Sequence, residues 1–283
     1  MKREIKAYFE KLSPSQLGLS SKIKVKSANK LGMGKSNLNY LINANGKKFV
    51  FRMNIDSKDP TKSRKEFRIL KTIEKHNIGP KARLLDDSMN EIKGKFIIMD
   101  YREGKSLDKF RYPHSKEVVR FLGKLCAQIH SIRGEDISKL RYARGDVNNY
   151  LDWIAYELKY INKHMQNNVF KKMLQNSFQQ VKTKYSSIKH SNEKVFTQGD
   201  FCEQNIVYHK KRGYMIDFED ASLTSPTAEI ARIFVDFGRG GLDESRRKVF
   251  LKEYYKLIKI KNKKRFESEI DSFQPFIMFA AFL

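Results

Sequence analysis

Three polar side chains in the C-terminal half of the sequence have the residue types that phosphoryl transfer requires. Asp200 and Asn205 lie in QGDFCEQNIVY (198–208), and Asp217 follows in MIDFED (215–220). One carboxylate can orient and deprotonate an attacking hydroxyl, while an amide oxygen and a second carboxylate can hold Mg²⁺ on nucleotide phosphates. The intervening segment is typical of a β-hairpin, which can return Asp217 to Asn205. A polar turn explains any one of these residues equally well, but the ordered set favours chemistry.

The N-terminal part of the chain predicts a β-hairpin behind a first helix. Helical spacing predicts a helix that ends at Pro14, followed by a short candidate strand at 23–25. Apolar residues then alternate with polar ones on both sides of Asn45-Gly46, a strong signal for a tight turn. This pattern predicts two antiparallel strands.

One main helix and two further strands follow the hairpin. Asp59 is a good N-cap, and Pro60 then occupies the first predicted helical position. Apolar runs near 82–85 and 96–99 complete a small sheet.

The rest of the chain has a mostly helical pattern from about Pro113 onward. Short strands are expected at 195–197, 206–208 and 214–216, with a turn at 211–213 between the last two. The apolar C-terminal run FIMFAAFL is expected to form a buried helix, or else the chain stops short of a fuller C-terminus.

These motifs resemble the aminoglycoside phosphotransferase and choline kinase family, whose members are relatives of the protein kinases. The family's catalytic loop reads H-G-D-x-x-x-x-N and is followed by I-D-[FW]-[ED]. The resemblance implies that Asp200 is the catalytic base and that Asn205 and Asp217 are magnesium ligands. It also implies an α+β, two-lobed protein-kinase-like fold. Residues 1–102 would form a small nucleotide-binding β-sheet lobe with one main helix, and 103–283 a larger, mostly helical catalytic and substrate-binding lobe.

The segment LGMGKSN (31–37) resembles the family's phosphate-covering loop. In such a loop Gly32 and Gly34 would let the backbone approach phosphate oxygens, and Ser36 would add a hydroxyl donor. The spacing G-x-x-x-x-G-K-[ST] of a Walker loop is absent. A plain turn is the alternative interpretation.

Arg52 lies on the strand where protein kinases keep a phosphate-binding lysine. Arginine at this place resembles the choline kinase branch, and its planar fork can grip phosphate with two nitrogens. Glu66, on the following helix, is expected to orient Arg52 through an ion pair. The alternative for Glu66 is an ordinary surface glutamate.

The segment FIIMDYREG (96–104) resembles the hinge between the two lobes of the family. Met99, Asp100 and Tyr101 are therefore expected at the nucleotide, with backbone groups from Asp100 to Arg102 meeting adenine.

Two positions depart from the family pattern. Gln198 stands where the loop usually begins with histidine, and we expect it to brace the loop by donating and accepting hydrogen bonds. PTAEIAR (226–232) resembles D-P-x-x-D-[LI]-A, with Glu229 in place of aspartate. We interpret Glu229 as a structural brace.

The acceptor is expected to bind in a helical insert at about 114–190, together with the C-terminal helices. Trp153, Tyr156 and Tyr160 follow i, i+3, i+7 spacing. They could cage a quaternary amine by cation–π contact, but the preferred interpretation is core packing.

Three acidic residues near the predicted base bear on the acceptor's charge. Glu203, Glu219 and Asp220 could attract a cationic acceptor, or they could face magnesium or solvent. Choline, ethanolamine, a sugar and an aminoglycoside all stay open as acceptors.

Composition limits the alternatives without deciding between them. The chain has 57 basic and 32 acidic residues, and its net charge of +25 makes nucleic acid a partner to consider. The lysines are spread along the chain, however, so charge alone decides nothing. Two cysteines exclude a disulfide framework, and no apolar run approaches the roughly 20 residues of a membrane span, so we expect a cytoplasmic protein.

The sequence therefore predicts an ATP- and Mg²⁺-dependent kinase that phosphorylates a small-molecule hydroxyl. A protein kinase is the second interpretation, although Arg52 and Gly199 replace the lysine and the loop arginine of that class. A third is a non-catalytic nucleic-acid-binding protein that kept the fold. Asp200, Asn205 and Asp217 are all present, which argues against this third interpretation.

Overall fold

The computed structural model describes residues 1–33, 37–55, 61–110, 115–133, 137, 147–186, 193–238 and 240–282. The chain forms two compact units. Met1–Gly104 and Tyr214–Glu219 make the first, and Lys105–Gly213 and Asp220–Leu283 make the second. The short segment that ends the predicted hairpin thus packs with the N-terminal residues.

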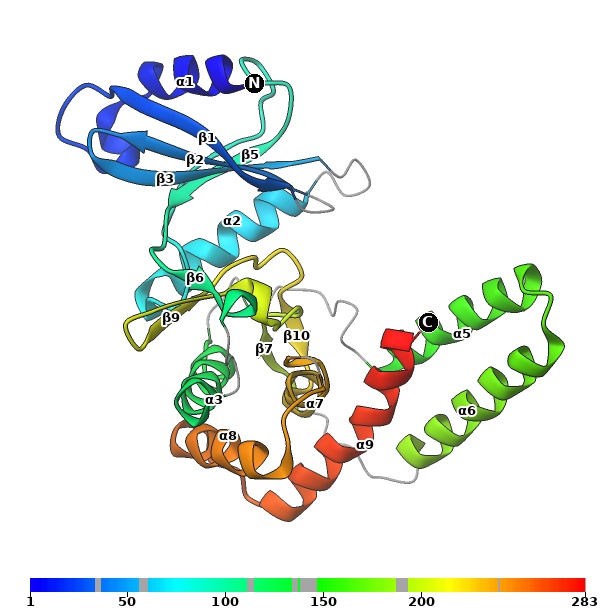
Figure 1. Ribbon diagram of the computed structural model, residues 1–283. Coiled ribbons are helices and arrows are strands. Elements are labelled where there is room, and N and C mark those ends of the chain that lie inside the picture. Colours follow the sequence, from blue (N-terminus) through cyan, green and yellow to red (C-terminus); the bar gives the residue numbers. More distant parts are fainter. Residues whose placement is uncertain are drawn as a thin grey trace. The chain divides into compact units, whose positions relative to one another are not determined.

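The first unit is an antiparallel sheet with a helix on each face (Figure 1). Its strands have the order β1-β2-β3-β5-β4, and the helices are α1 and α2. The bounds are β1 (Val25–Met33), β2 (Asn37–Ala44), β3 (Lys47–Asn54), β4 (Ala82–Asp86), β5 (Phe96–Asp100), α1 (Lys2–Lys11) and α2 (Lys62–Ile73).

The predicted hairpin is confirmed. β2 and β3 pair in register from Asn37 opposite Asn54 to Ala44 opposite Lys47. The two loop residues, Asn45 and Gly46, have φ values of 48° and 75°, as a two-residue turn with left-handed backbone requires.

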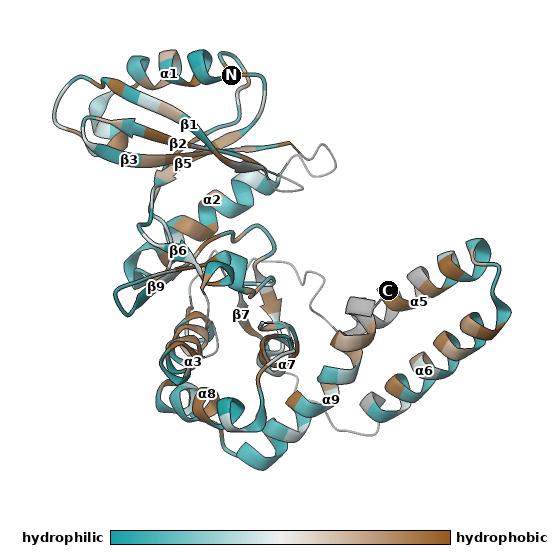
Figure 2. Ribbon diagram, in the orientation of Figure 1, coloured by the Kyte–Doolittle hydropathy of each residue, from teal (hydrophilic) through white to brown (hydrophobic). Residues whose placement is uncertain are grey.

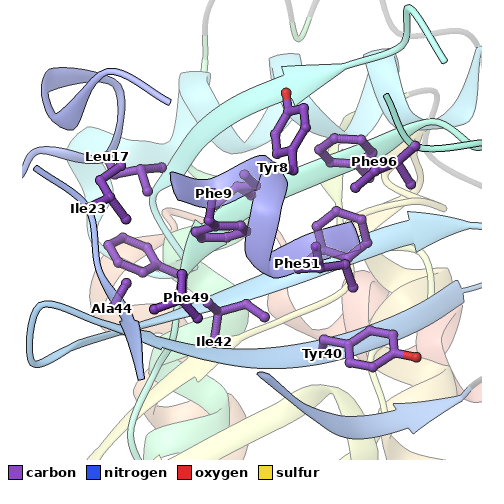
Figure 3. Close-up of a cluster of buried hydrophobic side chains, with 14 of the residues drawn as sticks. Tyr8, Phe9, Leu17, Ile23, Tyr40, Ile42, Ala44, Phe49, Phe51 and Phe96 are labelled. Carbon is purple, nitrogen blue, oxygen red and sulfur yellow. The ribbon is translucent and has the colours of Figure 1, made fainter. Parts of the chain in front are cut away.

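Aromatic side chains from α1 and one face of the sheet form the core of the first unit (Figure 3). Phe9, Phe49, Phe51 and Phe96 are almost completely buried, and the rings of Phe51 and Phe96 lie 4.5 Å apart. Because side chains alternate along a strand, Arg52 projects from the face opposite Phe51. The α1 side of the sheet is therefore apolar, and the α2 side receives the charged residue.

Two predicted boundaries in this unit are wrong. The main helix begins at Lys62 with Thr61 as its N-cap, and Asp59 and Pro60 lie outside the described residues. The strand expected at 23–25 instead runs from Val25 to Met33 because it pairs with β2 along most of its length. It is an edge strand with exposed residues, so it lacks the alternation by which buried strands are recognised.

The second unit consists mainly of helices and two small sheets. α3 packs on α8, and α7 packs on α9. The helices are α3 (Lys116–His130), α5 (Val147–His164), α6 (Asn168–Ser186), α7 (Pro226–Asp236), α8 (Glu244–Leu257) and α9 (Lys263–Phe282). The strands are β6 (Lys105–Ser106), β7 (Val195–Thr197), β8 (Ile206–His209), β9 (Arg212–Met215) and β10 (Ser222–Thr224), with β9 continuing into the first unit.

Short 3₁₀-helices occur in both units, at Pro14–Leu17, Glu74–His76, Leu107–Lys109 and Glu203–Asn205. The turn between β8 and β9 falls one residue earlier than predicted. It is made by Lys210 and Lys211, which both have positive φ, while Arg212 and Gly213 belong to β9.

The aromatic stripe on α5 is not core, contrary to the preferred interpretation. Tyr156 and Tyr160 are 67% and 57% exposed, and the side chain of Trp153 is outside the described set. Ile154 and Leu158 pack inward instead, because a helix places them on the face opposite Tyr156. Hydrophobic and hydrophilic residues accordingly alternate along α5 and α6 (Figure 2).

The apolar C-terminal run lies in α9 as far as Phe282, and its phenylalanines Phe276 and Phe279 are buried while Met278 is 60% exposed. Phe276 and Phe279 pack against Leu158 of α5 and Leu174 of α6. None of the helices in the described part of the chain combines the length and apolarity needed to cross a membrane.

Replacing Phe51 by alanine is expected to destabilise the first unit by about 3–5 kcal/mol, because the change leaves a cavity beside Phe96. Urea unfolding monitored by circular dichroism measures the loss. Tyr156→Ala, at an exposed ring, should change the free energy of unfolding by about 0.5 kcal/mol at most. Equal losses in the two variants would contradict this description of the core.

Candidate active site

The loop after β7 brings two of the predicted residues into contact in the second unit. Asn205 Nδ2 donates to Asp200 Oδ2 at 2.9 Å and to the backbone oxygen of Asp200 at 3.0 Å. The amide nitrogen of Asn205 thus faces Asp200. The other amide atom, Oδ1, is an acceptor oxygen and has the chemistry of a metal ligand. The short 3₁₀-helix Glu203–Asn205 closes the loop and places Asn205 next to the carboxylate.

The first residues of this loop are fixed by close packing. Gly199 has a φ of +85°, and a Cβ atom there would overlap the backbone oxygen of Asp220, so only glycine fits. The buried Gln198 accepts a hydrogen bond from the Asp200 N–H at 2.8 Å through its Oε1. This contact confirms that Gln198 braces the loop.

Glu229 of α7 connects the loop to a buried polar network. Its Oε1 accepts from the Gly199 N–H at 2.9 Å, and its Oε2 lies 2.9 Å from His130 Nε2. The other ring nitrogen of His130 lies 2.9 Å from the hydroxyl of Tyr254, and burial raises the pKa of that hydroxyl far above its usual value. The expected bracing role of Glu229 is confirmed.

Arg232 also contacts the loop, and the sequence analysis did not single it out. Its Nη2 donates to Asp200 Oδ1 at 2.7 Å, and its Nη1 donates to the backbone oxygen of Gly199 at 2.9 Å. The available signal was helical spacing, because Glu229 and Arg232 are three residues apart and therefore share one face of α7.

In the first unit, Arg52 lies among three carboxylates. Arg52 Nε is 3.2 Å from Glu66 Oε2, and its Nη2 is 2.6 Å from Asp217 Oδ1 and 3.1 Å from Glu219 Oε2. The expected ion pair between Arg52 and Glu66 is confirmed. Sequence reasoning missed that Asp217 and Glu219 contact the same guanidinium.

Glu219 is held by residues of its own chain. Besides Arg52, it pairs with Lys62 Nζ at 3.0 Å and accepts a hydrogen bond from Asn37 Nδ2. Glu219 is therefore already paired within the first unit, and its role toward a cationic acceptor stays a prediction. Asp217 has a φ of 65°, a left-handed conformation that aspartate tolerates better than most residues.

Burial and charge act in opposite directions within this cluster. Burial raises the pKa of Glu66 and of Asp217 although Arg52 opposes both shifts. Burial also acts to raise the pKa of Glu219, but Arg52, Asn37 and Lys62 outweigh it and lower that pKa. Arg52 loses solvation, yet the three carboxylates raise its pKa overall, so it stays charged.

The expected hinge residues use part of their hydrogen-bonding capacity inside the sheet. The N–H groups of Asp100 and Tyr101 donate to the backbone oxygens of Lys81 and Lys48, at 2.9 and 3.1 Å. The Asp100 carboxylate is bound by Arg83 at 2.7 Å, and Met99 is buried. These two N–H groups are therefore engaged within the first unit, and the expectation that backbone groups of 100–102 meet adenine stays a prediction.

The phosphate-covering loop is only partly described. Gly32 lies within β1 opposite Asn39, rather than in a loop. Gly34 and Ser36 lie outside the described residues.

Comparison with known proteins supports the resemblance seen in the motifs. The model of the phosphotransferase enzyme family (APH) matches residues 27–257. Curated proteins gave no match. Solved structures gave matches over nearly the whole chain, and at their low identities this likeness shows the fold, which is α+β and protein-kinase-like as predicted.

Three of these structures illustrate the likeness. A choline kinase from Cryptosporidium parvum Iowa II has a TM-score of 0.69 at 15% identity, over 98% of this chain and 86% of its own. An AMP-bound spectinomycin phosphotransferase has a TM-score of 0.70 at 14% identity, over 100% and 89%. An ADP-bound aminoglycoside phosphotransferase has a TM-score of 0.62 at 14% identity, over 88% and 82%.

Arg52→Gln is expected to destabilise the protein by about 3–5 kcal/mol, because it leaves the buried Glu66 and the partly buried Asp217 and Glu219 without their shared cation. Without Arg52 the raised pKa values of Glu66 and Asp217 rise further. A carboxyl whose pKa is raised by folding stabilises the protein at low pH, and this contribution is lost as pH rises. The loss of unfolding free energy in Arg52→Gln should therefore grow between pH 5 and pH 8. Urea unfolding across this range measures it.

The matched control is Arg83→Gln, which removes a more exposed arginine–carboxylate pair in the same unit. Its cost should be about 1 kcal/mol or less. If Arg52→Gln cost no more than this control, or became less harmful as pH rose, the account of the cluster would be wrong.

Proposed function

The chain belongs to the phosphotransferase enzyme family, and we propose that it transfers the terminal phosphoryl group of ATP, with Mg²⁺, to a hydroxyl of a small molecule. Family membership supplies the reaction class, a phosphotransferase with an alcohol group as acceptor. The observation that carries the proposal is the contact of Asn205 with Asp200, within a loop whose order of residues matches the family motif.

Asp200 is the proposed catalytic base. The hydroxyl proton of the acceptor passes to the Asp200 carboxylate while the acceptor oxygen bonds to the terminal phosphorus. The bond from that phosphorus to the bridging oxygen breaks, and ADP leaves. Support comes from the carboxylate itself, which is ionically paired but still 40% exposed and so accessible to a substrate hydroxyl.

Asn205 and Asp217 are the proposed magnesium ligands. Their donor atoms fit a hard cation, since an amide oxygen and a carboxylate are oxygen ligands of the kind Mg²⁺ prefers. When bound, Mg²⁺ would offset the negative charge of the nucleotide phosphates. Arg52 contacts the Asp217 carboxylate through Nη2 and so holds this proposed ligand in place.

Arg52 is the proposed phosphate-binding cation of the first unit. Glu66 lies 3.2 Å from its Nε, and Asp217 and Glu219 contact its Nη2, so Nη1 is the nitrogen that we assign to phosphate. Gly32, Gly34 and Ser36 are proposed to cover the phosphates, as their motif implies. Met99, Asp100 and Tyr101 remain the proposed nucleotide segment, with the backbone of Arg102 as its adenine-facing donor.

The proposed acceptor is an aminoalcohol or an aminosugar. Choline kinase and aminoglycoside phosphotransferases are among the solved proteins of this fold. Acidic groups beside the catalytic loop support a cationic acceptor, because Asp108 lies near enough to Glu203 to add to the effect of burial in raising the pKa of that carboxyl. Attraction of a cation by such a group is an electrostatic effect that high salt weakens.

Choline, ethanolamine, glucosamine and kanamycin form the panel that tests this function, with ADP release from MgATP as the measurement. Asp200→Asn should lower kcat by about 10²–10⁴-fold for the acceptor that the wild type uses, while the affinity for MgATP changes little. Turnover at the wild-type rate would remove Asp200 from the role of base. The absence of turnover with every compound would reject this acceptor class.

Asp217→Ala should abolish the part of ATP binding that depends on magnesium, because it removes a proposed ligand of the metal. Titration calorimetry with ATP, in Mg²⁺ and in EDTA, measures this part as the difference between the two affinities. Asp236→Ala is the control, since Asp236 is another partly buried, arginine-paired aspartate. A magnesium effect of wild-type size in Asp217→Ala would contradict the assignment.

A further inference from the structure

We propose that Arg232 is a positioning residue for this reaction and holds Asp200 in its working orientation from α7. The inference rests on the proposed function of Asp200 as the base. It assigns a role to a residue outside the motifs of the catalytic loop.

One guanidinium makes two contacts with the loop. Arg232 Nη2 donates to Asp200 Oδ1 at 2.7 Å, and Nη1 donates to the backbone oxygen of Gly199 at 2.9 Å. Because the guanidinium is planar and rigid, these contacts fix the carboxylate relative to the backbone that carries it. A lysine ammonium lacks this fork and cannot reproduce the paired geometry.

The two oxygens of Asp200 are held by different elements. Arg232 binds Oδ1, and Asn205 Nδ2 binds Oδ2 at 2.9 Å. The Asp200 side chain is 40% exposed, so packing alone does not orient it. The hydrogen bonds from the two sides therefore determine where the carboxylate points.

Arg232 is itself held by Asp236, which lies one helical turn further along α7. Its Nε donates to Asp236 Oδ2 at 3.2 Å, and burial raises the pKa of Asp236 against the opposing charge of Arg232. Glu229, on the same helix, holds the N–H of Gly199. Glu229 and Arg232 of α7 thus contact the loop directly, and Asp236 of the same helix holds Arg232.

The arrangement also selects the oxygen that takes the proton. A cation already binds Asp200 Oδ1, which disfavours a second positive charge there, whereas Oδ2 meets two neutral donors, the Asn205 amide at 2.9 Å and the Cys202 thiol at 3.8 Å. A thiol is a weak donor, so Oδ2 can keep the amide bond and take the proton on its other lone-pair site. Arg232 therefore directs proton transfer to Oδ2.

Arg232→Gln and Arg232→Lys test the inference, with Arg247→Gln as the matched control. Arg247 is a partly buried arginine that contacts Phe234 of α7 and donates to the Leu242 backbone oxygen. Kinetics use MgATP and whichever of choline, ethanolamine, glucosamine and kanamycin the wild type phosphorylates fastest. Arg232→Gln should lower kcat by about 10²-fold, as misplacement of a reacting group does, with the KM for MgATP changed by about twofold at most.

Arg232→Lys should recover only part of kcat, and Arg247→Gln should keep the wild-type value. A wild-type kcat in Arg232→Gln, beside an inactive Asp200→Asn, would overturn the positioning role and leave the proposed function standing. Equal losses in Arg232→Gln and Arg247→Gln would overturn it too, because the effect would then be general.

Hydrogen exchange of the 199–202 amides needs no substrate and gives a second test of whether Arg232 holds the loop. Exchange should be faster in Arg232→Gln than in Arg247→Gln, since only the first loses the contact with the Gly199 oxygen. Identical exchange in the two variants would overturn the inference. A wild-type protein without turnover would reject the proposed function, and this comparison would still decide whether Arg232 holds the loop.

Discussion

The buried guanidinium of Arg52 is the interaction on which the charged part of the first unit depends. It joins strand β3, helix α2 and the segment after β9 by contacting Glu66, Asp217 and Glu219. Three carboxylates placed together, one buried and two partly buried, would repel one another without a cation, and removing one partner of such a cluster costs far more than breaking an exposed pair. Arginine suits this place because it stays charged and binds in several directions at once.

The second unit fixes its loop in a different way. There a helix, α7, contacts both the backbone and the side chain of a short turn through Glu229 and Arg232. Glu229 is in turn held by His130, which contacts Tyr254 in the core. A group that must be oriented before a substrate arrives is positioned more accurately by rigid helices than by the loop that carries it. The two units thus each prepare one part of the proposed chemistry.

Sequence reasoning succeeded where the signal was local. The hairpin around Asn45-Gly46 and the Arg52–Glu66 pair could be predicted because alternation, turn type and a motif specify them. Contacts between distant residues could not. Glu219 meets Asn37 across 182 residues, and no periodicity links two such positions.

Two other failures have physical causes of the same kind. Arg232 lies 32 residues from Asp200, and its spacing from Glu229 indicated only a shared helix face, without showing what that face contacts. The stripe at Tyr156 and Tyr160 was interpreted as core because its period is helical, but the period does not say which face packs inward. Ile154 and Leu158 follow the same period on the opposite side.

Phosphorus NMR of the reaction mixture tests the central claim most directly. Wild-type protein, ATP, Mg²⁺ and a single aminoalcohol or aminosugar should give the resonance of a phosphate monoester, split by the protons of the carbon that bore the hydroxyl, together with ADP. Release of inorganic phosphate alone, or a spectrum that shows only unchanged ATP for every acceptor of this class, would contradict the claim that the chain phosphorylates a small-molecule hydroxyl.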